Sequence, residues 1–274
     1  MTIEQVQIDK SLLDDLYEQS NHRKYVHPDP LEIVLRYDDI RDREIAALIA
    51  SSLAYGRVAQ ILKSVSAVLD QMGSPSDFVR NTTERSLQKT FGNFKHRFTT
   101  SDELVAIILG IKAAILRYGS LEECFKAGMS SSDSDVIPAL CRFVLAIRGA
   151  DNGNYNSMLP SPPKGSACKR LNLFLKWMVR RDRVDPGGWI CVNSSKLIIP
   201  LDTHMFRIGT AFGMTIRKQA NLVTAREITD AFRAIAPDDP TKYDFALTRL
   251  GMEHGTKVVD HIQEHFMQRA GTHA

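Results

Sequence analysis

Apolar residues along the chain recur mostly at helical spacing. They fall three, four and eight positions after Ile45, Gly56 interrupts the pattern, and the same spacing resumes from Ile61 to Met72. This periodicity is typical of an amphipathic helix, in which 3.6 residues make one turn and one stripe faces the core. We therefore expect a helix, a break at Gly56 and a second helix.

Caps and breakers mark the later helices. Thr100 and Glu103 have the spacing of a capping box, which predicts a helix that ends near Gly119. Further helices are expected at about 135–147, from near 166 through Met178, after Asp202, at 224–236 and at 243–250. We find no alternating, β-branched run of the kind that predicts a strand. The predicted fold class is all-α.

A long connector divides the predicted helices. Residues 149–165, GADNGNYNSMLPSPPKG, are rich in Gly, Asn, Ser and Pro, which is typical of chain without regular structure. The connector separates two halves, or two lobes of one fold. We expect residues 1–274 to form a single two-lobed helical domain.

The composition adds no special class. The 274 residues are 43% hydrophobic and 24% charged, as in an ordinary globular protein with a sizeable core. The apolar stretches are shorter than the ~18 residues needed to span a bilayer. The first residues, MTIEQVQIDK, carry acids where a signal peptide has a basic and then an apolar segment. We expect a cytoplasmic protein with no membrane partner.

Cysteine and histidine spacing predicts neither metal nor cofactor. The four cysteines are widely spaced and form no CxxC pair, so free thiols are expected rather than a zinc or iron–sulfur site. His261 and His265 are four positions apart, but HIQEH lacks the HExxH arrangement and a third ligand. We expect them to be surface residues of the last helix.

Positive charge concentrates in one helix. Residues 164–183 contain seven Lys or Arg and one acid, Asp182. One helical face, opposite the apolar stripe, is predicted to carry Lys169, Asn172, Lys176, Arg180 and Arg183. Such a face is either a solvated surface or a site for a polyanion, whose phosphates would relieve the repulsion between like charges.

Two residues suggest chemistry. Lys169 lies in the first turn of the basic helix, where the helix dipole and Arg170 favour a neutral, nucleophilic amine if the side chain is partly buried. Asp202, in KLIIPLDTHMFRIG, precedes an apolar stripe and is a favoured helix cap, worth ~1 kcal/mol. Lys169 as a surface lysine and Asp202 as a cap are the simpler interpretations, although a capping carboxylate can also be a catalytic one.

These residues carry a resemblance. LPSPPKGSACKRLNLF at 159–174, followed by IPLDTHMFRIG at 199–209, resembles the core of the helix-hairpin-helix DNA glycosylases, the superfamily of endonuclease III and 8-oxoguanine glycosylase. Lys169 matches the nucleophilic lysine and Asp202 the aspartate. The rest of the signature is matched by Thr203, His204 and Arg207. IASSLAYGR, 49–57, is similar to the end of the first core helix.

The resemblance covers about residues 40–255 and includes departures. The hairpin reads PSPPKGS instead of Leu-Pro-Gly-Val-Gly, and Lys169 lies 33 positions before Asp202, farther than in endonuclease III. That separation is similar to the archaeal 8-oxoguanine glycosylases, and the chain as a whole resembles a bacterial family without an established activity. The carboxy-terminal cysteine cluster of endonuclease III is absent, which agrees with the expectation of no iron–sulfur cluster.

The resemblance implies a monomeric base-excision repair glycosylase that acts on damaged duplex DNA without a cofactor. Lys169 would attack C1′ of a flipped-out nucleotide and Asp202 would stabilise the developing charge. Whether the enzyme is also an AP lyase, and whether its substrate is an oxidised purine such as 8-oxoguanine, stays open. A non-catalytic DNA-binding protein of the same fold is the alternative, and a protein that binds RNA or an acidic partner is a third.

Further site residues follow from the resemblance and from the residue types. Candidate DNA contacts are Gly165, Ser166, Arg170, Lys176, Arg180, His204 and Arg207. Candidates for the base pocket are Tyr55, Trp177, Trp189, Asp244 and Phe245. Core packing remains the competing interpretation for the aromatic residues, a partly buried histidine for His204, and a carboxylate at a helix start for Asp244.

Overall fold

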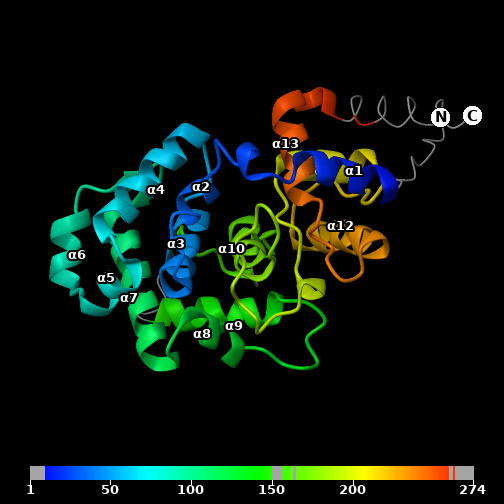
Figure 1. Cartoon of the computed structure of the whole chain (residues 1–274). Coiled ribbons are helices and arrows are strands. Elements are labelled where there is room, and N and C mark those ends of the chain that lie inside the picture. The colour runs from blue at the N-terminus through cyan, green and yellow to red at the C-terminus, as the bar shows by residue number, and fades with distance from the viewer. Residues whose placement is uncertain (1–9, 150–155, 163–164, 259–261, 263–274) are drawn as a thin grey trace, which may run out of the picture.

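The computed structural model describes residues 10–149, 156–162, 165–258 and 262. In this part of the chain thirteen α-helices accompany short 3-10 turns and one two-stranded sheet, as Figure 1 shows. The all-α fold class is therefore confirmed for the described residues.

The helices alternate with short loops through most of the chain. Before the connector they are α1 (Lys10–Ser20), α2 (Leu31–Val34), α3 (Ile40–Ser52), α4 (Val58–Met72), α5 (Pro75–Asn81), α6 (Glu84–Phe91), α7 (Ser101–Tyr118), α8 (Leu121–Ala127) and α9 (Ile137–Arg148). After it they are α10 (Lys169–Val179), α11 (Thr203–Ala211), α12 (Leu222–Ile235) and α13 (Asp244–His254). Strands β1 (Lys95–His96) and β2 (Thr99–Thr100) pair antiparallel. The 3-10 turns are η1 (Arg23–Tyr25), η4 (Ser194–Lys196) and η5 (Gly255–Lys257).

Local signals set several helix ends as the sequence predicts. The Thr100 hydroxyl accepts a hydrogen bond from the Glu103 amide, and the Glu103 carboxylate accepts one from the Thr100 amide, so the capping box is confirmed. Gly56 lies in the break between α3 and α4 with φ +101°, a conformation that suits glycine because it has no Cβ. Both sites stop or start a helix through chemistry visible in the sequence.

Other elements differ from the prediction. Helix α1, the short helices α2, α5, α6 and α8 and the β1–β2 hairpin are not predicted. The short elements span too few turns or residues to show a clear periodicity. Helix α10 begins at Lys169 rather than near Ser166, since Cys168 adopts a left-handed conformation with φ +50°. Residues 150–155 and 163–164 of the connector, together with His261 and His265, lie outside the described residues.

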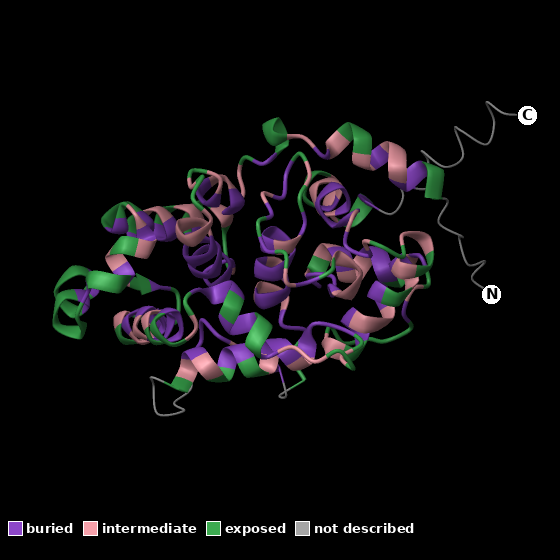
Figure 2. Ribbon diagram, turned by 60° about the horizontal axis from the view of Figure 1, so that its bottom comes forward, coloured by how far each residue is buried: buried purple, intermediate pink, exposed green. Residues whose placement is uncertain are grey.

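Helix α10 runs through the centre of the molecule, with α2–α7 on one side and α1, α12 and α13 on the other (Figure 1). It packs against α3 and buries Leu171, Phe174, Leu175, Trp177 and Met178. Figure 2 shows that buried positions gather on the central helices and exposed positions on the outer ones. A helix in this position is enclosed by protein on most sides, which changes the environment of its polar face as well.

In the ranges that the structure describes, no single helix has the length and apolar composition needed to cross a bilayer. Helices α7 and α8 together meet the length and composition criterion, but a bend of 71° separates them. Within the same ranges the four cysteines are free thiols, and no three His, Cys, Asp or Glu side chains group as metal ligands would.

Candidate catalytic pocket

A pocket of about 550 Å³ lies where the α3–α4 turn meets the first turns of α10 and α11. Lys169 and Asp202 both line it, and the Lys169 Nζ atom is 3.9 Å from Asp202 Oδ2. The Lys169 side chain is 38% exposed and that of Asp202 15%. The fold thus brings an amine and a carboxylate from distant segments to the same accessible cavity.

Asp202 is a helix cap and an ion-pair partner at once. Its Oδ1 accepts hydrogen bonds from the backbone amides of His204 and Met205, at 2.9 and 2.8 Å. The other oxygen, Oδ2, is the one nearest Lys169. Because the cap fixes Oδ1, the carboxylate cannot turn away from the lysine without losing two hydrogen bonds. The two interpretations of Asp202 are therefore compatible.

The cysteine beside Lys169 is a poor nucleophile. Cys168 precedes α10, lines the pocket and is 2% exposed. Burial raises the pKa of its thiol to about 11, so it stays protonated near neutral pH. Of these two side chains, Lys169 is better placed to act as a nucleophile, because it reaches solvent.

A smaller cavity of about 70 Å³ lies between this ion pair and the protein interior. Lys169 and Asp202 line it together with Lys176, Asp244 and Phe245. A cavity of this size can hold several water molecules. The pocket therefore has an inner end where buried charged groups approach the Lys169–Asp202 pair.

Asp244 is the buried acid of that inner cavity. It is 5% exposed, its Oδ2 is 3.3 Å from Lys176 Nζ, and its Oδ1 has no hydrogen-bond partner in the described structure. Burial raises the pKa of Asp244 to about 6, although the Lys176 ammonium opposes the shift. An acceptor oxygen without a partner beside a cavity is suited to an N–H group of a ligand.

Asp29 is a pocket residue that the sequence analysis missed. It lines both cavities, and its Oδ1 accepts the Leu31 amide at 2.9 Å. Its Oδ2 is 3.4 Å from the guanidinium of Arg249, and desolvation in the cavity raises its pKa. Asp29 lies 140 positions before Lys169 in a Pro-Asp-Pro turn. No motif links two residues so far apart.

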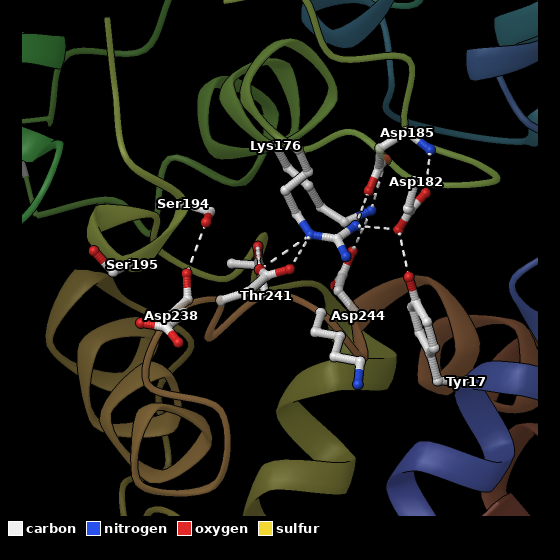
Figure 3. Close-up of polar contacts among 12 residues, drawn as sticks. Tyr17, Lys176, Asp182, Asp185, Ser194, Ser195, Asp238, Thr241 and Asp244 are labelled. Atoms are coloured by element: carbon white, nitrogen blue, oxygen red, sulfur yellow. Dashed lines mark hydrogen bonds and ion pairs between the residues drawn. The ribbon is translucent and has the colours of Figure 1, made fainter. Parts of the chain in front are cut away.

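The predicted basic face of α10 is wrong in its centre. Asn172, Lys176 and Arg180 are 1%, 2% and 4% exposed. Lys176 Nζ is 3.2 Å from Asp185 Oδ1 and 3.3 Å from Asp244 Oδ2, and Figure 3 shows these side chains together. Lys176 and Arg180, both expected to contact DNA, are thus enclosed by protein.

Three carboxylates surround Arg180. It pairs with Asp182 and Asp239, each at 2.9 Å, and with Asp185. Asp182 also accepts a hydrogen bond of 3.0 Å from the Tyr17 hydroxyl (Figure 3). Burial alone would lower the pKa of Arg180, but these acids raise it. The predicted face also fails at Arg183, because α10 ends at Val179 and Arg183 lies beyond it, where it pairs with Glu18. The periodicity did not show that acids from other segments cover Lys176 and Arg180.

The remaining predicted DNA contacts are only partly accessible. Gly165 and Ser166 are exposed, and Ser166 lines the pocket. The Arg170 guanidinium donates to the carbonyls of Ser52 and Ser157, both at 2.6 Å, and therefore joins the end of α3 to the connector.

His204 and Arg207 likewise have structural contacts. His204 is half-buried and packs against Gly251, where a Cβ would come within 2.7 Å of it. Arg207 donates to the Gly255 carbonyl at 2.7 Å and holds the end of α13. These contacts hold the pocket wall in position. Phosphate binding by His204 or Arg207 stays a prediction.

The candidates for the base pocket separate into two groups. Tyr55 lines the outer pocket, and Trp177, Asp244 and Phe245 line the inner cavity. Trp189 lines neither of them. It packs 5.1 Å from the Phe174 ring and donates its indole N–H to buried Glu44 at 3.0 Å. Trp189 is therefore a core residue, as the competing interpretation proposed.

The chain belongs to the DUF2400 family, which is described as a protein family of unknown function and whose model matches residues 29–253. The match includes Lys169, Asp202 and Asp244. No curated protein and no solved structure matches the chain.

Proposed function

We propose that this protein is a cytoplasmic DNA glycosylase of base-excision repair, with Lys169 as nucleophile and Asp202 as its carboxylate partner. The observation that carries the proposal is the 3.9 Å approach of Lys169 Nζ to Asp202 Oδ2 inside a pocket of about 550 Å³. Pockets of about 300–1,000 Å³ are typical of small-molecule sites, and a flipped-out nucleoside is such a ligand. The PLDTH resemblance at Asp202 supplies the reaction class.

The chemistry needs one amine and one carboxylate. With a damaged nucleotide in the pocket, the neutral Lys169 amine attacks C1′, the C1′–N bond breaks, and its electron pair leaves with the base, which takes up a proton. Asp202 accepts the ammonium proton of Lys169 beforehand and passes it to the departing base, and the regenerated carboxylate stabilises positive charge on the sugar. Ring opening, in which O4′ takes up a proton, then gives a Schiff base on Lys169. Loss of the C2′ proton and departure of the 3′ phosphate break the C3′–O bond by β-elimination, so the enzyme is an AP lyase as well.

The inner cavity supports a base that carries N–H donors. The free Oδ1 of Asp244 is an acceptor at the inner end, and leaving it unpaired in the loaded site would cost about 1–3 kcal/mol. The Watson–Crick edge of a guanine-type base has ring and exocyclic N–H groups that satisfy a carboxylate. We therefore propose an oxidised purine such as 8-oxoguanine as the substrate class.

Borohydride trapping tests the proposal. The wild type is incubated with duplex DNA that contains 8-oxoguanine or an abasic site, and borohydride reduces any Schiff base to a stable adduct. We expect an adduct with the wild type and none with Lys169→Gln. Lys63→Gln is the matched control, because Lys63 is an exposed lysine of α4 that does not line the pocket.

Two results would contradict the catalytic proposal. One is the absence of an adduct with the wild type under conditions in which a known lyase is trapped, and the other is an undiminished adduct with Lys169→Gln. If trapping fails while DNA binding persists and weakens with salt, the protein is the non-catalytic DNA-binding alternative. Competition with RNA and with an acidic polypeptide distinguishes the third class.

A further inference from the structure

An exposed aromatic ring projects from the β1–β2 hairpin and stacks on a residue that lines the pocket. Phe98 lies between β1 and β2 and is 62% exposed. Its ring stacks on Tyr55 with a centroid distance of 4.8 Å and an interplanar angle of 22°. Since Tyr55 lines the catalytic pocket, the stacked pair extends the aromatic wall of the pocket outward to solvent.

Buried polar contacts hold this pair in place. The Tyr55 hydroxyl donates to the His96 carbonyl at 2.9 Å, and the His96 Nε2 atom is 3.0 Å from the Tyr55 carbonyl. The other ring nitrogen of His96 is 2.9 Å from the Ser64 hydroxyl, and the histidine is 1% exposed. The hairpin is thus tied to α4 and to the α3–α4 turn. A ring presented by a fixed segment loses little conformational entropy when it binds a partner.

Thr99 adds a second attachment on the far strand. Its hydroxyl is 2.5 Å from that of Tyr55 and 2.7 Å from that of Ser157 in the connector. The hairpin tip itself, Arg97, has φ +55°. A left-handed residue at this position lets the two short strands pair while the Phe98 side chain remains in solvent. Burial of apolar area therefore does not explain the position of Phe98.

Cations lie close to the Tyr55 ring on which Phe98 stacks. Arg97 lies 5.9 Å from the Tyr55 centroid and extends across Gly56, where a Cβ would be 2.8 Å from its Cδ. Arg170 lies 5.0 Å from the same Tyr55 ring, and Lys95 in β1 and Arg57 before α4 are exposed. The hairpin sequence KHRFTT contains no acid. An isolated aromatic ring among positive charges differs from the broad apolar patch that a protein partner requires.

We propose that Phe98, supported by Tyr55, is a stacking platform for an unpaired nucleobase of a DNA strand entering the pocket. Every base has a flat face that stacks on an aromatic ring, and neighbouring cations attract the backbone phosphates. The platform selects DNA with a locally unpaired base over fully paired duplex. The inference rests on DNA as the partner of the proposed function, but it concerns binding and requires no reaction at Lys169.

Fluorescence anisotropy of the full-length protein tests the platform. The probes are a labelled duplex with one bulged thymine and the same duplex fully paired, neither of which contains a damaged base. We expect Phe98→Ala to weaken binding of the bulged duplex about 5- to 150-fold and to change binding of the paired duplex little. Phe98→Trp should retain the preference, whereas Phe98→Leu, which is apolar but cannot stack, should lose it.

Leu116→Ala is the matched control. Leu116 is 67% exposed, like Phe98, but it lies near the other end of α7, about 22 Å along the helix from Ser101. Its loss should not alter either affinity. Because neither leucine nor phenylalanine is buried at these positions, both variants are expected to fold.

The outcomes separate this inference from the glycosylase proposal. Equal weakening of both duplexes by Phe98→Ala, no weakening, or no DNA binding by the wild type would each overturn the platform. Tighter, Phe98-dependent binding of single-stranded RNA would assign the platform to RNA instead. If no adduct is trapped but the Phe98-dependent preference for the bulged duplex persists, the lyase proposal fails and the platform stands. If an adduct is trapped but the preference is absent, only the platform fails.

Discussion

Two lysines of helix α10, seven positions apart, have opposite environments. Lys169 is 38% exposed, and its Nζ is 3.9 Å from one carboxylate, Asp202. Lys176 is 2% exposed and lies within 3.3 Å of both Asp185 and Asp244. The spacing between them corresponds to about two turns, or about 10 Å along the axis. Within that distance the helix passes from an accessible pocket into the protein interior.

The difference shows how many carboxylates a buried ammonium group requires compared with an exposed one. A buried ammonium needs several close carboxylates, because a single pair in low dielectric does not offset the loss of hydration. Asp185 and Asp244 supply them and raise the pKa of Lys176, although burial alone would lower it. Among the described residues Lys169 has one carboxylate within 4 Å, and it keeps access to solvent and to the cavity. That makes Lys169 suited to chemistry and Lys176 suited to holding the fold together.

The same substitution at both lysines should give the largest contrast. Lys176→Gln leaves Asp185 and Asp244 buried with one cation fewer, and we expect it to lower the free energy of unfolding by about 3–5 kcal/mol. Lys169→Gln removes a half-exposed pair, and the expected loss is below about 1 kcal/mol. Urea unfolding measures both.

In the trapping assay the order should reverse. Lys169→Gln abolishes the adduct, whereas the folded fraction of Lys176→Gln retains it. Equal destabilisation by the two substitutions would show that the two environments do not differ energetically as their burial indicates.

The pH dependence of stability sharpens the comparison at Asp244. The folded protein holds a proton on Asp244 up to about pH 6, whereas an ordinary aspartate loses it near 3.8. Wild-type stability should therefore fall relative to Asp244→Asn as pH rises through this window, by about 2–3 kcal/mol. Urea titrations of both proteins at several pH values measure the difference. A difference that stays constant across the window would contradict the raised pKa.

Two substitutions of Asp202 separate its two roles, and Asp202→Asn gives the smallest expected change in stability. Asp202→Ala removes the α11 cap and should cost about 1 kcal/mol, whereas Asp202→Asn keeps an oxygen that accepts the His204 and Met205 amides and should cost only a few tenths. Thermal or urea unfolding measures both. Neither variant has the carboxylate charge, so both should trap less DNA than the wild type. If Asp202→Asn forms as much adduct as the wild type, the catalytic role is contradicted and helix capping is the role that remains for Asp202.

The parts of the fold that the sequence predicts are those that local signals determine. The α3–α4 break at Gly56, the Thr100 capping box and the helix after Asp202 depend on neighbouring residues, and the sequence contains all of them. The short helices and the β1–β2 hairpin depend on packing against distant segments. The same is true of Asp29, which reaches the pocket from a turn that carries no recognisable motif.

The predicted site shows the same division. Lys169 and Asp202 came from a motif resemblance, and the structure brings them to one pocket. Phe98 went unnoticed, since a single phenylalanine in KHRFTT gives no sign that it will remain exposed.

The sequence by itself determined the helical class, the caps and the face of α10 on which its polar residues lie, because these follow from periodicity and from hydrogen bonds between near neighbours. Only the tertiary structure decided which of those residues meet solvent. Lys176 and Arg180 are enclosed because Asp185, Asp239 and Asp244 approach from other segments, whereas the first turn of α10 opens onto a cavity. The electrostatic free energy of a charge depends on its surroundings in space, and those surroundings come from residues far away in the chain.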